Sequence, residues 1–341
     1  MMIDIAALNF VSGNPFYMTG SVDAAQLAIN PLMPEDIAAI SEMTFPAFRP
    51  LLAPCLAGEA HDGCAVFARV ARDGGIPVGL VLAQTPLAAA ADGGDAEQPK
   101  TARLLSVSVV PAWRRRGVAM RLMRSLEEEL IQRGCTKLTT GYTTRMPAWQ
   151  PLEKLLATCR WPAPETTLLL SMAQIANVMN APWLAAPREV PPGFELFEWA
   201  QLTADERARL QREVDGGEIP GELSPFGDDE FIEPAISVGV RHKGEVVAWM
   251  IVIRSPWVPD ALCYRSQYVR PQLRAAQALG PLTLAEAICR HAVSPIEATR
   301  PVAAFGMSFK NSTKQVNFFR KRLAPFCFTT YESRAVMKEL A

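Results

Sequence analysis

Apolar and polar residues follow one another with two different periods around residue 110, and this change of period predicts a strand followed by a helix. Residues 104–110 read LLSVSVV, an apolar and β-branched run typical of a buried or half-buried strand. In residues 119–133 the apolar side chains recur every three or four positions, which places them on one face of a helix. The segment VSVVPAWRRRGVA at residues 107–119 is therefore predicted to pass from a strand through a glycine-containing turn into an amphipathic helix.

Similar patterns on both sides of this segment predict a mixed α/β fold for the first half of the chain. Residues 27–40 favour a strand that leads into a helix, because Pro34, Glu35 and Asp36 are typical of a helix start. The other elements are predicted from alternation and turn residues. They are a hairpin at residues 64–70 and 76–84 around Asp73-Gly74-Gly75, a strand at 137–144 and a helix at 150–159.

The second half of the chain repeats this order of elements. Thr203 and Glu206 form a capping box before a helix, and Lys243-Gly244 marks the turn of a hairpin. The predicted elements are strands at residues 194–198, 236–241, 246–253, 262–269 and 302–308, and helices at 206–214, 282–292 and through Phe318 and Phe319. An order of elements that recurs after about 150 residues indicates a duplicated fold.

Length and composition divide the chain into two domains. Its 341 residues exceed the usual size of one domain, and residues 182–193 carry four prolines without periodicity. We therefore expect an N-terminal extension at residues 1–24, a first domain at 25–181, a linker at 182–193 and a second domain at 194–341.

The turn before the helix carries the main chemical signal. Arg114, Arg115 and Arg116 lie where the helix begins, and the helix dipole disfavours positive charge there. An anion between the arginines and the helix would reverse that penalty. Gly117 and Ala119 leave room for a ligand to approach the N–H groups of the first turn. The turn therefore predicts phosphate binding, with a solvated arginine run on an ordinary surface helix as the alternative.

The spacing Arg114-x-x-Gly117-x-Ala119, with a strand before it and a long amphipathic helix after it, resembles the acyl-CoA signature Q/R-x-x-G-x-G/A of the GNAT acyltransferase superfamily. The resemblance extends over about residues 25–172. It implies the α/β, mixed-sheet GNAT fold, present here as two tandem domains, with acetyl-CoA or another acyl-CoA as co-substrate and no metal. The residues that it implies for binding acyl-CoA are Val109, Val110, Arg114, Arg115, Arg116, Gly117, Val118 and Ala119.

The second copy departs from this signature. The glycine that follows Arg274 is Gly280, six residues later instead of three, and Pro281 removes one backbone donor from the helix start. We therefore expect one acyl-CoA site in the first domain and a degenerate second domain, with two working sites as the alternative.

Acyl transfer requires a polarised thioester carbonyl, a deprotonated amine and a proton donor for the leaving thiolate. GNAT proteins polarise the carbonyl with a backbone N–H near the end of the strand before the turn, and Val110 is the candidate because Pro111 has no N–H. The predicted helix at 150–159 has no tyrosine. Tyr142 is therefore the nearest phenol that could act as the general acid, the proton donor for the leaving thiolate. Ordinary strand packing is the alternative for Tyr142.

The general base is less well defined by the sequence. Residues 104–110 include no carboxylate, although many members of the family carry one on this strand. Glu59 and His61 precede the predicted strand at residues 64–70, in a region that often borders the acceptor, and a histidine side chain can accept a proton near neutral pH. The alternative is that both are ordinary exposed loop residues. Direct attack by a neutral amine, with water relaying the proton, needs no dedicated base.

Together these residues predict an acyl-CoA-dependent N-acyltransferase. We expect acetyl transfer from acetyl-CoA to a primary amine of a small molecule or peptide, by direct attack in a ternary complex. Two alternatives remain open. One is a module that binds or senses acyl-CoA without turnover, and the other is an acyltransferase whose donor is carried by an acyl carrier protein.

Composition narrows the class of protein. A net charge of -1 argues against nucleic-acid binding, and the most hydrophobic segment, 168–184, is interrupted by polar residues and predicts no membrane span. The seven cysteines without CxxC spacing and the three scattered histidines predict reduced thiols and no metal site. We therefore expect a cytoplasmic monomer or homodimer.

Overall fold

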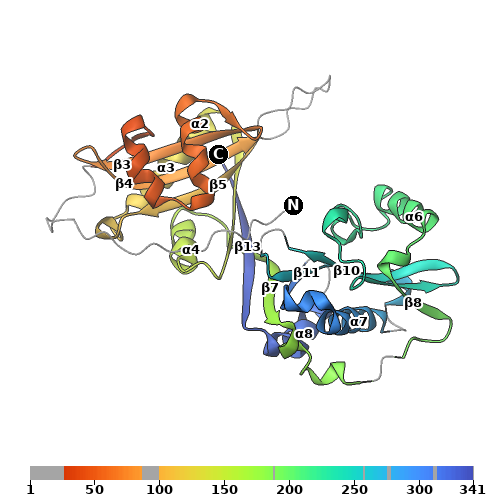
Figure 1. Ribbon diagram of the computed structural model, residues 1–341. Coiled ribbons are helices and arrows are strands. Elements are labelled where there is room, and N and C mark those ends of the chain that lie inside the picture. Colours follow the sequence, from red (N-terminus) through yellow and green to blue (C-terminus); the bar gives the residue numbers. More distant parts are fainter. Residues whose placement is uncertain are drawn as a thin grey trace. The chain divides into compact units, whose positions relative to one another are not determined.

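The computed structural model describes residues 27–86, 100–186, 189–255, 258–274, 278–309 and 313–340. These residues form two compact units (Figure 1). Unit 1 holds the chain up to Thr166 together with residues from Ser333 to the end, and unit 2 holds Thr167–Glu332. The N-terminal extension that we expected at residues 1–24 lies outside the described residues.

Unit 1 is built on a sheet in the order β1-β3-β4-β5-β6-β13, with the short β2 paired to β3. The β5–β6 pair is parallel, whereas β1–β3, β3–β4, β4–β5 and β6–β13 are antiparallel. The strands are β1 (Ala28–Pro31), β2 (Ala60–His61), β3 (Cys64–Asp73), β4 (Ile76–Pro86), β5 (Lys100–Val109), β6 (Cys135–Thr143) and β13 (Thr329–Glu339).

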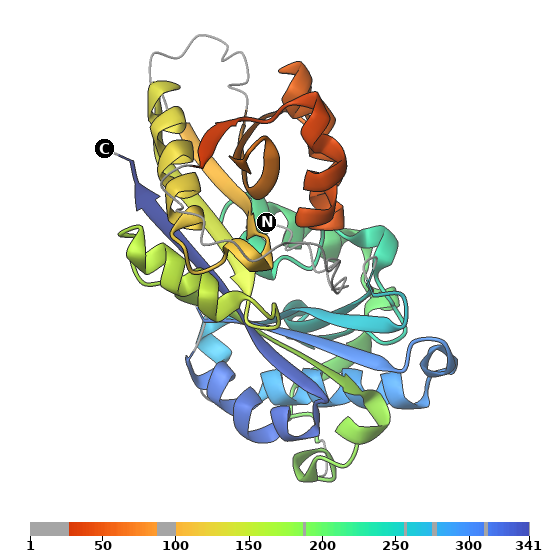
Figure 2. The ribbon, with the colours of Figure 1, turned by 90° about the vertical axis from the view of Figure 1, so that its left-hand side faces the viewer.

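Helices cover both faces of this sheet, because neighbouring residues of each strand point in opposite directions. On one face Val70 and Leu80 pack with α1 (Ile37–Met43) and α2 (Leu52–Ala57). On the other face α3 (Val118–Gln132) and α4 (Trp149–Thr158) pack on β3 to β6, as Figure 2 shows. Helix α3 lies close to β4 at Gly79, where an added Cβ would come within 2.9 Å of Leu122 Cδ1.

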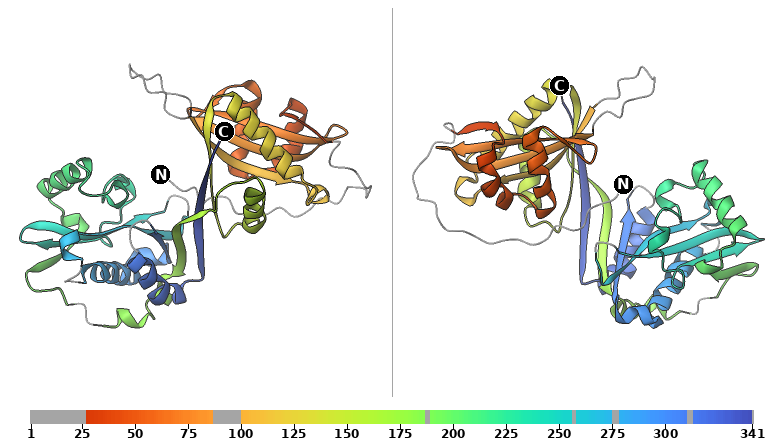
Figure 3. Two further views of the ribbon diagram at one scale, coloured as in Figure 1. Left: turned by 180° about the vertical axis from the view of Figure 1, so that it is seen from behind. Right: turned by 45° about the horizontal axis from the view of Figure 1, so that its top comes forward.

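Unit 2 has a sheet of the same design, in the order β8-β9-β10-β11-β12-β7, in which β11 and β12 are the parallel pair. Helices α5, α7 and α8 share one apolar cluster on one face of this sheet, and α6 packs on the other face (Figure 3). The strands are β7 (Glu165–Gln174), β8 (Phe194–Glu198), β9 (Val238–His242), β10 (Glu245–Arg254), β11 (Ala261–Val269) and β12 (Val302–Ser308). The helices are α5 (Ile175–Val178), α6 (Ala204–Asp215), α7 (Leu279–Val293) and α8 (Thr313–Arg322).

Individual hydrogen bonds recur at equivalent positions in the two units. Val110 N donates to Val78 O at 3.0 Å in unit 1, and Arg270 N donates to Val247 O at 2.9 Å in unit 2. Arg114 Nε and Arg274 Nε each donate, at 2.9 Å, to the carbonyl of the residue five positions earlier. The predicted α/β fold and the predicted duplication are confirmed.

The two units do not coincide with the contiguous domains 25–181 and 194–341 that we expected. The end of β13 pairs with β6 of unit 1, from Ser333 opposite Thr143 onward, while β7 pairs with β12 of unit 2. Each half of the chain therefore contributes its last strand to the other unit. The segment expected as a linker, 182–193, begins inside unit 2, where Trp183 Nε1 donates to Arg322 O at 3.1 Å. A strand pattern predicts that a strand forms but not which strand it pairs with, which explains the difference.

A buried ion pair fixes the start of α1 to the sheet of unit 1. The side chains of Asp36 and Arg72 are only 1% and 8% exposed, and Arg72 also donates to Pro31 O at 3.0 Å. We expect Asp36→Ala to lower the free energy of unfolding by about 3 kcal/mol, because it leaves a buried guanidinium without its carboxylate. Urea unfolding followed by tryptophan fluorescence measures the change. The exposed neighbour Glu35, changed to Ala, is the control, and equal effects of the two substitutions would contradict this role of the pair.

Candidate functional site

The turn between β5 and α3 has the backbone geometry of an anion site. Arg115 and Gly117 both have left-handed conformations, with φ of 62° and 79°, and α3 begins at Val118. The first α-helical hydrogen bond runs from Arg121 N to Gly117 O at 3.1 Å, so the N–H groups of the first helical residues have no acceptor within the helix. Amides next to left-handed residues at a helix start form a concave donor surface for anions. An L side chain at position 117 would be strained by the positive φ.

The three arginines of the turn are exposed around this helix start. Arg114 Nε donates to Val109 O at 2.9 Å, and the guanidinium of Arg116 lies 5.3 Å from the centre of the Trp113 ring. These contacts hold the stems of both side chains on the protein. Their charge adds to the positive end of the helix dipole, so the turn favours an anionic ligand.

Strands β5 and β6 separate on the side that faces this turn. Their parallel ladder runs from Lys100 opposite Cys135 to Arg103 opposite Thr139, although β5 continues to Val109. The Thr140 hydroxyl donates to Leu104 O at 3.3 Å just beyond the ladder. We call the parts of the two strands that do not pair with each other the opening of unit 1, made by residues 104–109 of β5 and 140–143 of β6.

A bulge lies where the opening begins. The register between β4 and β5 shifts after Leu82, which faces Ser106, while the next residue Ala83 faces Leu104. One extra residue, Leu105, is thereby inserted into β5. Bulges re-aim the backbone groups of a strand and are common beside functional sites.

The amide of Val110 is not available for the oxyanion role that we expected. It donates to Val78 O at 3.0 Å and so belongs to the ladder with β4. Neighbouring residues of an antiparallel strand direct their N–H groups to opposite edges. The register therefore points the amides of Val107 and Val109 away from β4 and into the opening. The sequence pattern could not show this, because the bulge and the register decide which amides face the opening.

Tyr142 lies on β6 at the opening, and its hydroxyl donates a hydrogen bond to a carboxylate. It donates to Glu153 Oε1 at 2.6 Å, and Arg334 NH1 donates to the same oxygen at 2.7 Å. Burial, the hydrogen bond to Glu153 and the charge of Glu153 raise the pKa of Tyr142 well above its ordinary value. The phenol is therefore protonated at neutral pH, but its proton is held by Glu153. Catalysis by Tyr142 stays a prediction.

Residues 35–155 match the model of the acetyltransferase (GNAT) family. This match spans the turn, the opening and α3, and it ends within α4. The GNAT family is therefore shown for residues 35–155 of the chain. No curated protein matches the sequence.

The fold of the whole chain is similar to that of a tandem GNAT protein from the clavulanic acid biosynthesis pathway. The two share 17% identity with a TM-score of 0.52, over 93% of this chain and 99% of that one. A glucosamine N-acetyltransferase region of a fungal β-N-acetylglucosaminidase shares 13% identity, with a TM-score of 0.49 over 92% of this chain and 38% of that one. A GCN5-related N-acetyltransferase from Kribbella flavida shares 12% identity, with a TM-score of 0.42 over 94% and 73% of the two chains. The first comparison supports a tandem GNAT fold.

Glu59 and His61, the two candidates for a GNAT general base, lie away from the opening. Glu59 is exposed, and His61 Nε2 is 3.5 Å from Asp62 Oδ2 on the turn that connects β2 and β3. That turn adjoins Cys64, which pairs with Pro86 at the end of β4. The opening begins about 10 Å away along the strands and two strands across. The structure does not bring either residue to the site.

Glu153 and Arg334 are parts of this region that sequence reasoning missed. They are 181 residues apart in the chain, and Arg334 reaches unit 1 only because the last strand pairs with β6. A local pattern carries no signal for such a contact. Ser106 and Ser108 were also missed; the register of β5 directs their side chains to the face opposite α3.

The corresponding turn in unit 2 shows why its signature is irregular. The left-handed residue before α7 is Ala278, with φ of 45°, and α7 begins at Leu279. Ala278 is thus the counterpart of Gly117, and Gly280 is the counterpart of Ala119. Gly280, which lies six residues after Arg274, is therefore not the left-handed residue of this turn, because the non-glycine residue Ala278 adopts that conformation.

Unit 2 carries polar side chains at positions that correspond to apolar ones in the opening of unit 1. Gln267, the counterpart of Val107, donates from Nε2 to Gly280 O at 2.7 Å, so this side chain contacts the first turn of α7. Arg265 occupies the bulge position of β11, forms an ion pair with Asp228 and donates to Ser224 O at 2.7 Å. The loop before β9 is thereby bound to the strand at the point where β11 and β12 separate.

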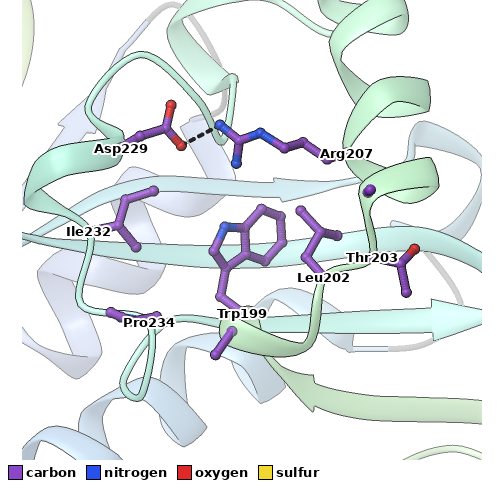
Figure 4. A pocket seen from close by; sticks show the side chains of 9 residues that line it. Trp199, Leu202, Thr203, Arg207, Asp229, Ile232 and Pro234 are labelled. Carbon is purple, nitrogen blue, oxygen red and sulfur yellow. Dashed lines mark hydrogen bonds and ion pairs between the residues drawn. The ribbon is translucent and has the colours of Figure 1, made fainter.

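An open pocket of about 420 Å³ lies elsewhere in unit 2, between α6 and the segment before β9 (Figure 4). Its charged groups satisfy each other, since Arg207 NH2 is 2.6 Å from Asp229 Oδ1. Trp199 and Thr203 also line it, and neither turn contributes a residue to its lining.

Two kinds of feature are absent from the described residues. None of their helices is long and apolar enough to span a membrane. They include no group of three or more His, Cys, Asp and Glu side chains that could hold a metal ion.

The contact between Tyr142 and Glu153 can be tested by titration. We expect Glu153→Gln to lower the pKa of Tyr142, because it removes both a hydrogen-bond acceptor for the phenol and a negative charge. Phenolate absorbance against pH, taken as the difference from Tyr142→Phe in each background, measures the shift. Glu128→Gln, which removes an exposed carboxylate from α3, is the control. An unchanged titration in Glu153→Gln would show that this carboxylate does not hold the phenol.

Proposed function

We propose that the chain is an acyl-CoA-dependent N-acyltransferase with one working site, in unit 1. It transfers an acetyl group from acetyl-CoA to a primary amine of a small molecule or peptide, by direct attack in a ternary complex. The observation that carries this proposal is the alignment of a left-handed glycine turn at the start of α3 with the open ends of β5 and β6. Phosphates and an extended acyl arm require these two features side by side.

Donor binding in this proposal uses backbone groups for most contacts. The pyrophosphate of acetyl-CoA accepts hydrogen bonds from the first amides of α3, and Arg114, Arg115 and Arg116 supply positive charge around it. The pantetheine arm lies in the opening along β5. There the amides of Val107 and Val109 face it, and Val107, nearer the bulge, is our candidate for polarising the thioester carbonyl.

The acceptor amine approaches from the face of β5 that carries Ser106 and Ser108. Its nitrogen lone pair attacks the carbonyl carbon, the carbon–sulfur bond breaks, and the thiolate leaves with the electron pair. Because residues 104–110 include no carboxylate, the amine enters neutral and passes its proton to water. The thiolate then takes a proton from water, since Glu153 holds the hydroxyl proton of Tyr142.

We assign unit 2 a structural role because its own side chains contact both the first turn of α7 and the face of β11 where an acceptor would approach. Gln267 contacts the first turn of α7, and Pro281, which has no N–H, removes one donor from that turn. Arg265 and Ser266 tie the loop around Leu223 and Ser224 to the other face of β11. An acyl-CoA would have to displace these contacts to enter.

Release of free thiol from acetyl-CoA in the presence of a panel of primary amines tests the activity. We expect Gly117→Glu to reduce the rate about 100-fold or more, because it puts an anion at the phosphate turn and an L residue at a positive φ. Gly280→Ala is the control, since its added Cβ meets no atom closer than 3.8 Å, and we expect it to leave the rate unchanged.

Equal losses from both substitutions would contradict the single-site proposal. Binding of acetyl-CoA without thiol release from any amine would instead support a sensing module, and release only from a carrier-bound donor would support the carrier-protein alternative.

A further inference from the structure

The end of β13 completes unit 1 and presents two basic residues to its helices. Residues from Ser333 to Glu339 pair with β6 from Thr143 to Lys137. Because strand side chains alternate, Arg334, Val336 and Lys338 share one face. Val336 is buried in the same apolar cluster as the core side chains of α3 and α4. The two basic residues therefore lie on the side of the sheet that carries these helices (Figure 2).

Arg334 fixes α4. Its NH1 group donates to Glu153 Oε1 at 2.7 Å, and its guanidinium lies 5.1 Å from the centre of the Trp149 ring. The carboxylate of Glu153 also accepts the Tyr142 hydroxyl at 2.6 Å. One carboxylate on α4 thus joins β13 to β6 beside the opening, and the side chains of Arg334 and Glu153 are each only 24% exposed.

Lys338 fixes α3. Its ammonium group donates to Glu127 Oε1 and Oε2 at 2.9 and 2.8 Å and to Cys159 O at 2.8 Å. Glu127 also accepts a hydrogen bond from Trp161 Nε1 at 3.2 Å. The side chains of Lys338 and Glu127 are 19% and 13% exposed, so these contacts are largely shielded from water. Glu127 lies on α3, the helix that begins directly after the candidate anion-binding turn.

We propose that Arg334 and Lys338 are positioning residues for the acyl-donor site of unit 1. They act through Glu153 and Glu127, which hold α4 and α3 against β6 on either side of the pantetheine path. This inference rests on the proposed function. It makes donor binding depend on the last residues of the chain, which follow the whole of unit 2 in sequence.

The physical reason is that the site is made of backbone donors on different elements. The amides at the start of α3 must stay at a fixed distance from the amides of Val107 and Val109 for one ligand to reach both. A displacement of about 1 Å between such elements is enough to lose hydrogen bonds and affinity. A carboxylate that loses its cation in a shielded site must find water or a new partner, which moves the helix that carries it.

Calorimetric titration of the full chain with acetyl-CoA tests this inference, together with thermal unfolding of each variant. We expect Arg334→Met and Lys338→Met each to raise the Kd for acetyl-CoA about tenfold at a temperature well below the melting transition. Arg334→Lys and Lys338→Arg keep the charge, and we expect both to bind nearly as well as the unaltered chain.

Glu339→Gln is the matched control. It removes an ion pair with Lys137 from the opposite face of the same strand, where Glu339 is 66% exposed, and we expect its Kd to be unchanged. Should a methionine variant fail to fold, Arg334→Gln and Lys338→Gln provide milder losses of charge with the same expected direction.

The outcomes separate this inference from the proposed function. Variants that melt at lower temperature yet bind acetyl-CoA with unchanged Kd would show that the ion pairs only stabilise the fold, and the inference would be wrong. An unaltered chain that does not bind acetyl-CoA would overturn the proposed function itself.

Discussion

The early end of the parallel ladder between β5 and β6 is the constraint on which the account depends. Beyond Arg103 and Thr139 the two strands have backbone groups without a partner strand, and the bulge at Leu105 sets which amides of β5 face that space. An extended ligand with amide groups of its own satisfies such an edge in the way that a further strand would. In the proposed site, the start of α3, with its left-handed Gly117, binds the anion at the end of the same path.

In our proposal, unit 2 keeps the same fold without the site. Both units retain the parallel pair, the bulge and the bond from an arginine to the end of the preceding strand. These features follow from apolar packing on both sheet faces, which many sequences satisfy. In the proposal the chemistry depends on fewer positions: where unit 1 has Val107, unit 2 has Gln267, whose side chain contacts the first turn of α7.

Local signals in the sequence predicted the elements and the turn well. The change of period near residue 110 and the glycine after the arginines specify a strand, a left-handed turn and a helix through short-range backbone preferences. The irregular second turn was also visible, but the sequence could not show that Ala278 adopts a positive φ there without being glycine. The exchange of β7 and β13, the contact of Arg334 with Glu153 and the use of the Val110 amide by β4 all depend on long-range register. Nothing in a local pattern encodes which strand edge another segment reaches.

The number of acetyl-CoA molecules bound per chain tests the central claim most directly. Calorimetric titration of the purified full chain gives this number without knowledge of the acceptor amine. One molecule per chain is the result that a single open site in unit 1 and a filled opening in unit 2 predict. Two molecules per chain would show that the side chains of unit 2 do not exclude the donor, and no binding would show that the opening of unit 1 is not an acetyl-CoA site.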